Sequence, residues 1–197
     1  GWSTAASGDW IALGSPYDNP SGVGGNAGSV VLYTDQASGE FQESQLLTAS
    51  NGGGWEHFGM SVRMAGDLLI TGAPQHPLDT REGAAYIFRL GGDGVWTEEA
   101  ILQADNGAWG DFFGHAVDID GDTAIVGAYR GDSNGNTSGA AYVFNRASDG
   151  IWSQGQQLIP AEQTIRFGTS VAIEGDTIIR TCHTLRCFAA QSIRQQI

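Results

Sequence analysis

The stretch from Phe113 to Tyr129 reads Phe-Gly-His-Ala-Val-Asp-Ile-Asp-Gly-Asp-Thr-Ala-Ile-Val-Gly-Ala-Tyr, and it decides the fold because its pattern recurs along the chain. A Phe-Gly pair, an apolar run, a Gly-Asp pair and a Gly-Ala pair return at 58–74, and most of the pattern returns again at 167–179. The repeats lie about 55 residues apart, which is the period of one propeller blade or one solenoid unit. The sequence therefore predicts an array of similar units.

Each unit is expected to hold four short strands. In the second unit these lie near 61–64, 68–73, 84–89 and 96–102. The Gly-Asp pairs fall between the first two strands, where glycine supplies the positive φ of a hairpin turn. The run 124–128 is apolar without alternation, as in a strand buried on both faces. The Gly-Ala pairs favour a place where backbones approach closely.

Antiparallel units that are apolar on both faces bury their surfaces by stacking on one another. We therefore predict an all-β fold, a β-propeller segment with three complete four-stranded blades and the first hairpin of a fourth. The expected boundaries are 1–57, 58–112 and 113–166 for the three blades, 167–179 for the start of the fourth, and 180–197 for a tail. A β-sandwich is the weaker alternative, because it does not require a whole-unit repeat.

The two ends of the chain depart from the repeat. Gly1 aligns with Gly59, so the chain starts inside the motif. Residues 180–197 contain no Gly and no acidic residue but hold both cysteines, and are interpreted as a truncated or frame-shifted end or a separate tail. Three units and a hairpin fall short of the four blades of the smallest propellers. We expect part of a longer chain, a homo-oligomer that completes a ring, or a tail that covers one open face.

The charge of the chain excludes some partners. It carries 22 acidic residues and nine basic ones, all of them arginine, for a formal net charge of −13. Such a charge repels phosphate backbones and anionic lipid surfaces, so neither nucleic-acid binding nor membrane insertion is expected. No stretch approaches the ~20 apolar residues of a membrane-spanning helix, and no signal segment is recognisable.

The Phe-Gly pairs at 58 and 113 and the Gly-Ala pairs at 72 and 127 resemble the FG-GAP repeat of integrin α subunits and of many bacterial extracellular proteins. The resemblance covers residues 1–179, with Tyr129 in place of the usual Pro in the third unit. It implies an extracellular or cell-surface propeller that serves adhesion, the recognition of a protein or carbohydrate ligand, or scaffolding. The family's calcium loop between the first two strands is too short here to enclose a cation.

Residues that recur in every unit are best explained by the fold, so functional candidates are those that differ. Asn51 with Asn106, and Glu56 with Asp111, recur before the Phe-Gly pair and are expected to brace that loop. The loops between the second and third strands differ in each unit and form the expected contact surface. Their candidate binding residues are Asp18, Asn19, His76, Asp79, Arg81 and Arg130.

A calcium site is one interpretation of the loop in the third unit. Asp132, Asn134 and Asn136 alternate as at the start of a calcium loop, but no acidic residue follows to supply a bidentate ligand. A weak calcium site or a polar loop without a cation both fit this pattern, and no other cofactor is expected.

Motifs for catalysis are missing from the sequence. No pair of histidines has helical zinc-ligand spacing, and there is no Gly-x-Ser-x-Gly elbow or phosphate-binding Gly-Lys-Ser/Thr loop. The sequence therefore predicts a non-catalytic binding or adhesion module. The alternatives are a structural, self-assembling repeat segment and an enzyme domain that lacks its partner half.

Overall fold

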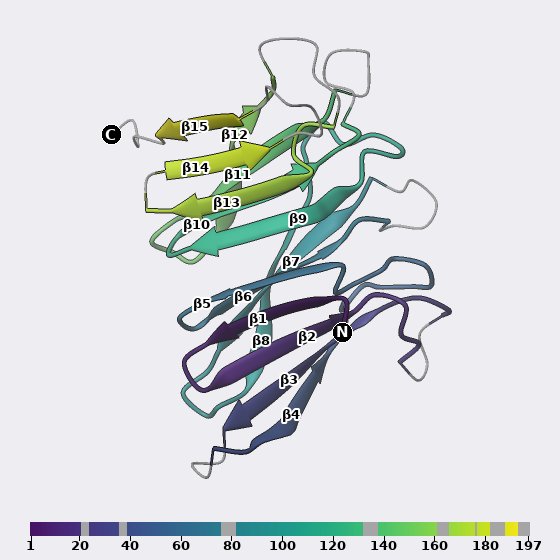
Figure 1. The fold of residues 1–197 in the computed structure, drawn as a ribbon, viewed down its shortest axis with the longest axis vertical. Helices are drawn as coiled ribbons and strands as arrows, with labels where there is room; N and C mark the ends of the chain where they lie inside the picture. The colour runs from purple at the N-terminus through teal and green to yellow at the C-terminus, as the bar shows by residue number, and fades with distance from the viewer. Residues whose placement is uncertain are drawn as a thin grey trace.

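The computed structural model of the chain is all-β, with fifteen strands and no helix among the residues that it describes. These are residues 1–20, 24–35, 39–75, 82–131, 138–160, 166–175, 177–181 and 188–192. The strands form four antiparallel sheets, each in simple chain order, which we number blades 1 to 4 (Figure 1). This architecture confirms the predicted fold class.

The strand bounds repeat closely from blade to blade. Blade 1 contains β1 (Ser3–Ser7), β2 (Trp10–Ser15), β3 (Ser29–Asp35) and β4 (Phe41–Leu47). Blade 2 contains β5 (Ser61–Ala65), β6 (Leu68–Ala73), β7 (Ala84–Leu90) and β8 (Trp96–Leu102). Blade 3 contains β9 (Phe113–Asp120), β10 (Thr123–Ala128), β11 (Ala140–Arg146) and β12 (Trp152–Leu158). Blade 4 contains β13 (Ser170–Glu174), β14 (Thr177–Thr181) and β15 (Phe188–Ser192).

Blade 4 has one strand more than the hairpin expected from the sequence. Strand β15 pairs antiparallel with β14, from Thr177 opposite Ser192 to Thr181 opposite Phe188. These residues lie in the segment that the sequence assigned to a tail outside the repeat. Backbone pairing needs no particular side chain, so a segment without the repeat pattern still adds a strand to the free edge of β14.

The Gly-Asp pairs that begin at Gly8, Gly66 and Gly121 form the predicted hairpin turns. In blade 2 the pair Gly66-Asp67 is the whole loop, because Ala65 lies opposite Leu68 in the ladder. Gly66 has a φ of 59°, and the equivalent glycines of the other three blades have φ values between 52° and 55°. Positive φ at the first position of a two-residue loop matches the twist of the flanking strands.

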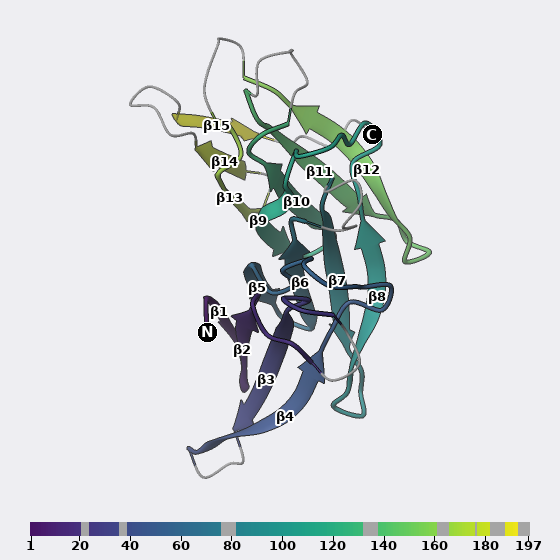
Figure 2. The same ribbon diagram turned by 90° about the vertical axis from the view of Figure 1, so that its right-hand side faces the viewer.

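The blades are arranged like a fan. The first strands β1, β5, β9 and β13 lie next to one another on the concave side, and the last strands β4, β8 and β12 lie on the convex side (Figure 2). Isolated parallel bridges link each blade to the next: Gly28 to Phe58, Gly83 to Phe113, and Gly139 to Phe167. The Phe-Gly motif therefore joins two blades rather than belonging to one.

The hydrophobic core is divided into three clusters, and each lies between two neighbouring blades. Phe58 contributes to the cluster between blades 1 and 2, Phe113 to the next, and Phe167 to the one between blades 3 and 4. The Phe113 ring packs edge-on against Tyr142 at 5.5 Å and Phe144 at 5.9 Å between ring centroids. Every residue of β6 is buried, as expected for a strand covered on both faces.

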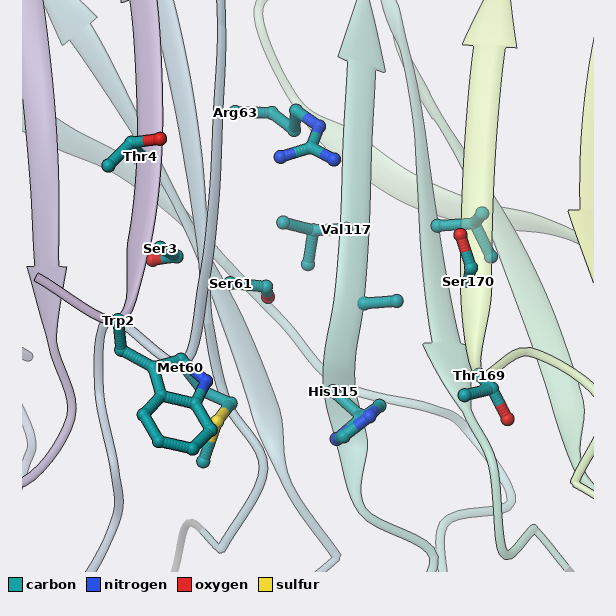
Figure 3. A pocket seen from close by; sticks show the side chains of 12 residues that line it. Trp2, Ser3, Thr4, Met60, Ser61, Arg63, His115, Val117, Thr169 and Ser170 are labelled. Carbon is teal, nitrogen blue, oxygen red and sulfur yellow. The ribbon is translucent and has the colours of Figure 1, made fainter.

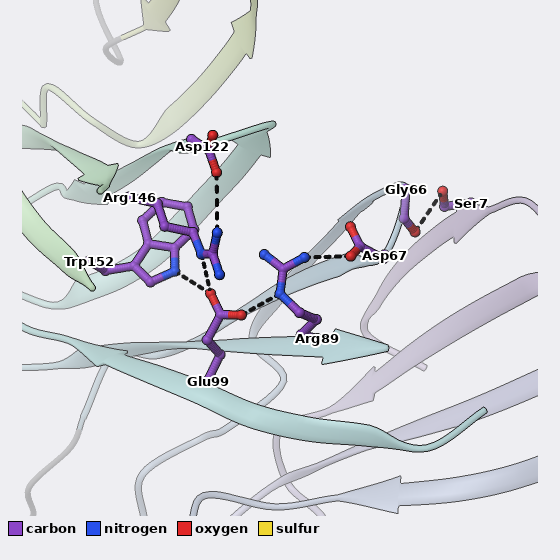
Figure 4. A network of polar contacts seen from close by, with 8 residues as sticks. All are labelled: Ser7, Gly66, Asp67, Arg89, Glu99, Asp122, Arg146 and Trp152. Carbon is purple, nitrogen blue, oxygen red and sulfur yellow. Dashed lines mark hydrogen bonds and ion pairs between the residues drawn. The ribbon is translucent and has the colours of Figure 1, made fainter. Parts of the chain in front are cut away.

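A polar network also holds blades 2 and 3 together near the convex side (Figure 4). The Glu99 carboxylate on β8 accepts hydrogen bonds from Arg89 Nε of its own blade, and from Arg146 Nε at 2.8 Å and Trp152 Nε1 at 2.7 Å in blade 3. Burial alone raises the pKa of Glu99, but these donors outweigh burial and lower the pKa to about 2. Glu99 is therefore ionised throughout the neutral pH range.

Candidate functional site

The two ends of the strands differ in the loops that they carry. One end has the two-residue Gly-Asp turns and the turns between the third and fourth strands. The other end has the longer connections, including those from β2 to β3, β4 to β5 and β8 to β9, on the right-hand side of Figure 1. We call it the loop-bearing end. Loops on a rigid frame are the usual location of recognition residues.

Asp18 and Asn19 lie in the β2–β3 loop at this end, and both are exposed. Asp18 Oδ2 accepts a hydrogen bond of 2.7 Å from Ser29 Oγ, and Asp18 Oδ1 accepts one of 2.9 Å from the Asn19 backbone N–H. The Asn19 side chain accepts a hydrogen bond from the Asn26 backbone N–H. Both side chains therefore help to shape their own loop, and their role in binding stays a prediction.

Arg130 lies at the same end, after β10, and is exposed. Its guanidinium carbon is 5.1 Å from the ring centroid of Phe112 and 5.7 Å from that of Tyr129. The His115 ring packs against Tyr129, and their ring centroids are 4.5 Å apart. Cation–π contacts of this kind orient the guanidinium without neutralising its charge.

The other predicted site residues fall outside the described part of the chain. They are His76, Asp79 and Arg81 of the predicted binding set, and Asp132, Asn134 and Asn136 of the predicted calcium site. Among the described residues, no group of three or more His, Cys, Asp or Glu side chains is placed to hold a metal ion.

The bracing residues predicted before the Phe-Gly pair have equivalent contacts in two blades. Glu56 Oε1 accepts a hydrogen bond of 2.7 Å from the Gly53 N–H, and Asp111 Oδ2 accepts one of 2.9 Å from the Ala108 N–H. Both carboxylates are buried. Since the same contact recurs, these acidic residues shape the loop, as the sequence analysis inferred.

The residue directly before the Phe-Gly motif has a left-handed backbone in each blade junction. The φ values are 60° at His57, 57° at Phe112 and 62° at Arg166. Strained non-glycine residues often mark functional sites. Here the strain recurs at every junction, so we assign it to the turn that brings the Phe-Gly pair against the previous blade.

A cavity of about 360 Å³ opens on the concave side, along the first strands of all four blades (Figure 3). We call it the axial groove. It is lined by the residues that directly follow the motif glycine in each unit, which are Trp2, Met60, His115 and Thr169. Arg63 lies at the opposite end of the groove from Trp2 (Figure 3). Burial lowers the pKa of His115, which favours its neutral form.

Sequence reasoning missed the axial groove, although a signal for it existed. The position after the motif glycine is Trp, Met, His and Thr in the four units. The loop residues were chosen as functional candidates because they differ between units in the same way. That criterion was not applied inside the motif, where residues were assumed to serve the fold.

The fold and the detected motif define a repeat protein of the propeller class. The FG-GAP repeat family matches residues 41–88 and 96–144, so the chain contains two FG-GAP repeats. Each matched segment begins on the last strand of one blade and ends on the third strand of the next, so the sequence repeat crosses a blade junction. No curated protein matches the chain.

The family has general properties that bear on function. FG-GAP repeats suggest a propeller-type binding or adhesion module, typically non-catalytic and typically part of an extracellular domain. Among the described residues, no helix is long and apolar enough to cross a membrane.

Proposed function

We propose that this chain is a non-catalytic extracellular binding or adhesion module that recognises a protein or carbohydrate ligand at its loop-bearing end. The observation that carries the proposal is the distribution of exposed aromatic side chains. Tyr17, Trp55 and Trp109 all lie in loops of that end, and Trp109 is 73% exposed. Tyr and Trp are enriched at binding sites because they offer a large apolar area with a polar tip.

An array experiment tests this function. The purified chain would be applied to glycan and extracellular-matrix protein arrays, in calcium and in chelator, since calcium binding at Asp132, Asn134 and Asn136 stays a prediction. The double variant Trp55→Ala, Trp109→Ala should lose the ligand. The control is Val95→Ala, Ile151→Ala, which removes exposed apolar side chains from turns at the opposite end. Absence of any ligand under both conditions would count against the proposal.

A second candidate function is self-association as a structural repeat segment. In blade 1, Ala12 and Leu32 pack into the core toward blade 2. The alternate residues Leu13, Val31 and Leu46 are register partners on the face that points away from blade 2, and Leu46 is 48% exposed. An apolar sheet face of this kind favours contact with another sheet.

Light scattering after size-exclusion chromatography, over a range of concentrations, tests self-association. Val31→Glu should convert an oligomer to a monomer by placing a charge on this face. Thr97→Glu, at an exposed position of β8, is the control and should leave the oligomer intact. A wild-type chain that stays monomeric at all concentrations removes this candidate.

A further inference from the structure

The position after the motif glycine varies from unit to unit while its place in the fold stays fixed. Trp2, Met60, His115 and Thr169 lie on equivalent residues of four blades, and all four line the axial groove (Figure 3). A purely architectural position would accept the same side chain in every blade. The four different side chains give the groove an apolar region and a polar region within one cavity.

Trp2 supplies a flat aromatic surface that neighbouring rings hold in place. Its side chain is 63% exposed, and the Tyr17 ring packs edge-on against it, with centroids 5.5 Å apart and an angle of 87° between the ring planes. Tyr17 packs in turn against His57 at 5.0 Å. An exposed, braced indole is suited to stacking against the apolar face of a sugar ring.

The charges in the groove are opposite to those of the chain as a whole. The chain has a formal net charge of −13, yet the described residues that line the cavity include the cation Arg63 and no carboxylate. The Arg63 side chain is 52% exposed; its Nη1 donates to the Val62 carbonyl oxygen at 2.9 Å, and its Nε lies 3.9 Å from Asp118 Oδ1. A guanidinium held in this way is suited to bind a carboxylate.

Hydroxyl groups of Thr4 and Ser170 also line the groove. Hydroxyls both donate and accept hydrogen bonds, as the hydroxyls of a sugar require. An acidic peptide would use Arg63, but it would leave the Trp2 face and this polar stretch without a matching partner. The combination favours a carbohydrate over a peptide.

We propose that the axial groove binds a carbohydrate that carries carboxylates, a uronic acid oligomer, with one sugar ring stacked on Trp2 and a carboxylate bound by Arg63. This inference rests on the proposed binding function. It assigns the ligand class to the groove rather than to the loops.

Tryptophan fluorescence and calorimetry with trigalacturonate test the assignment. We expect saturable binding that weakens as salt rises, because the contact with Arg63 is ionic. The neutral comparator, a galactose trisaccharide, should bind at least about tenfold more weakly, since it lacks the charge-assisted hydrogen bonds. Triglutamate should not compete. Equal binding of the neutral and charged sugars, or tighter binding of triglutamate, overturns the proposal.

Variants locate the site. Arg63→Gln should lose about tenfold or more in affinity for trigalacturonate, while Arg63→Lys, which keeps the charge without the planar fork, should lose less. Trp2→Ala should weaken binding of both sugars. Ile151→Ala, which changes an exposed side chain in the turn between β11 and β12, is the control and should bind as wild type. Unfolding midpoints of each variant show whether the fold is intact, and trigalacturonate binding that is unchanged in Arg63→Gln and Arg63→Lys contradicts the assignment.

The outcomes separate this inference from the proposed function. If the arrays yield a ligand that depends on Trp55 and Trp109, but trigalacturonate does not bind, the binding function stands and the groove assignment fails. If trigalacturonate binds through Arg63 and Trp2 but the loop variants change nothing on the arrays, the groove is the recognition site and the loops are not.

Discussion

The carbonyl oxygen of Gly114 lies against the Cα of Gly72, so closely that a Cβ built on Gly72 would be 1.8 Å from that oxygen. The same relationship holds at the other two junctions, with distances of 2.2 Å for Gly14 and Gly59 and 2.1 Å for Gly127 and Gly168. The glycine near the end of one blade's second strand and the glycine of the next blade's Phe-Gly pair are therefore the two sides of one contact.

We expect Gly72→Ala to destabilise the chain by at least about 2 kcal/mol, because the added Cβ meets backbone rather than a flexible side chain. The matched control is Gly92→Ala, where a Cβ meets nothing within 4 Å and φ is not positive. That variant should stay within about 1 kcal/mol of wild type. Chemical denaturation measures both, and equal losses would contradict the close-contact explanation.

Ala116→Ser is expected to stabilise the junction between blades 3 and 4. Ser3 Oγ donates to the Gly59 carbonyl oxygen at 2.8 Å, and Ser61 Oγ donates to that of Gly114 at 2.9 Å. Ala116 occupies the equivalent position and has no hydroxyl. The new bond to the Gly168 carbonyl oxygen should add about 1 kcal/mol to the free energy of unfolding, and Ser61→Ala should remove a similar amount. A drop in stability for Ala116→Ser would show that the junction lacks room for the hydroxyl.

Stability should depend on the ionisation of Glu99 at low pH. A carboxyl group whose pKa falls from 4.5 to about 2 on folding stabilises the fold by about 3 kcal/mol at neutral pH. Because the folded pKa is the lower one, this contribution is complete well above the unfolded pKa of 4.5 and is lost as the pH falls toward about 2.

The difference in unfolding free energy between wild type and Glu99→Gln, measured by urea denaturation, should therefore shrink between pH 5 and about pH 2.5. Glu43→Gln replaces an exposed carboxylate of β4 and serves as the control, with little effect at any pH. A difference for Glu99→Gln that stays constant over this range would mean that the Glu99 carboxylate does not carry the effect.

Two equivalent tryptophans should respond differently to replacement by phenylalanine. Trp152 Nε1 donates to Glu99 Oε1, whereas the buried Trp96 Nε1 has no hydrogen-bond partner among the described residues. Trp96 is only 2% exposed. Even so, we expect Trp152→Phe to lower the free energy of unfolding by about 1 kcal/mol more than Trp96→Phe, because the Trp152 replacement breaks a hydrogen bond to a charged group. Thermal or urea unfolding of the two variants measures the difference. A larger loss of unfolding free energy for Trp96→Phe would contradict the expectation.

Local signals in the sequence were sufficient to predict where most of the strands and turns lie. The second-unit strands predicted near 68–73 and 96–102 have those bounds in the structure, because apolar runs between turn glycines leave little choice. Strand β15 was missed because its residues carry no repeat signal, and its pairing depends on the free edge of β14. Of the predicted binding residues, Asp18, Asn19 and Arg130 lie at the loop-bearing end.

The groove and the Glu99 network could not be predicted in the same way. Trp2, Met60 and His115 are separated by roughly one repeat period each, and only the curvature of the blade array brings their side chains around one cavity. Glu99 and Trp152 likewise meet across a blade junction. The number of residues between two distant positions does not show whether their side chains lie on the same side of the blade array.

The sequence by itself determined the repeating unit, because the alternation of apolar runs with glycine turns is a local property that each unit carries within its own residues. The tertiary structure alone decided which backbone contacts the motif glycines make and which residues surround the axial groove. Both follow from the distance and angle between successive sheets, which the packing of Phe58 and Phe113 against the previous and following blades sets over the whole array.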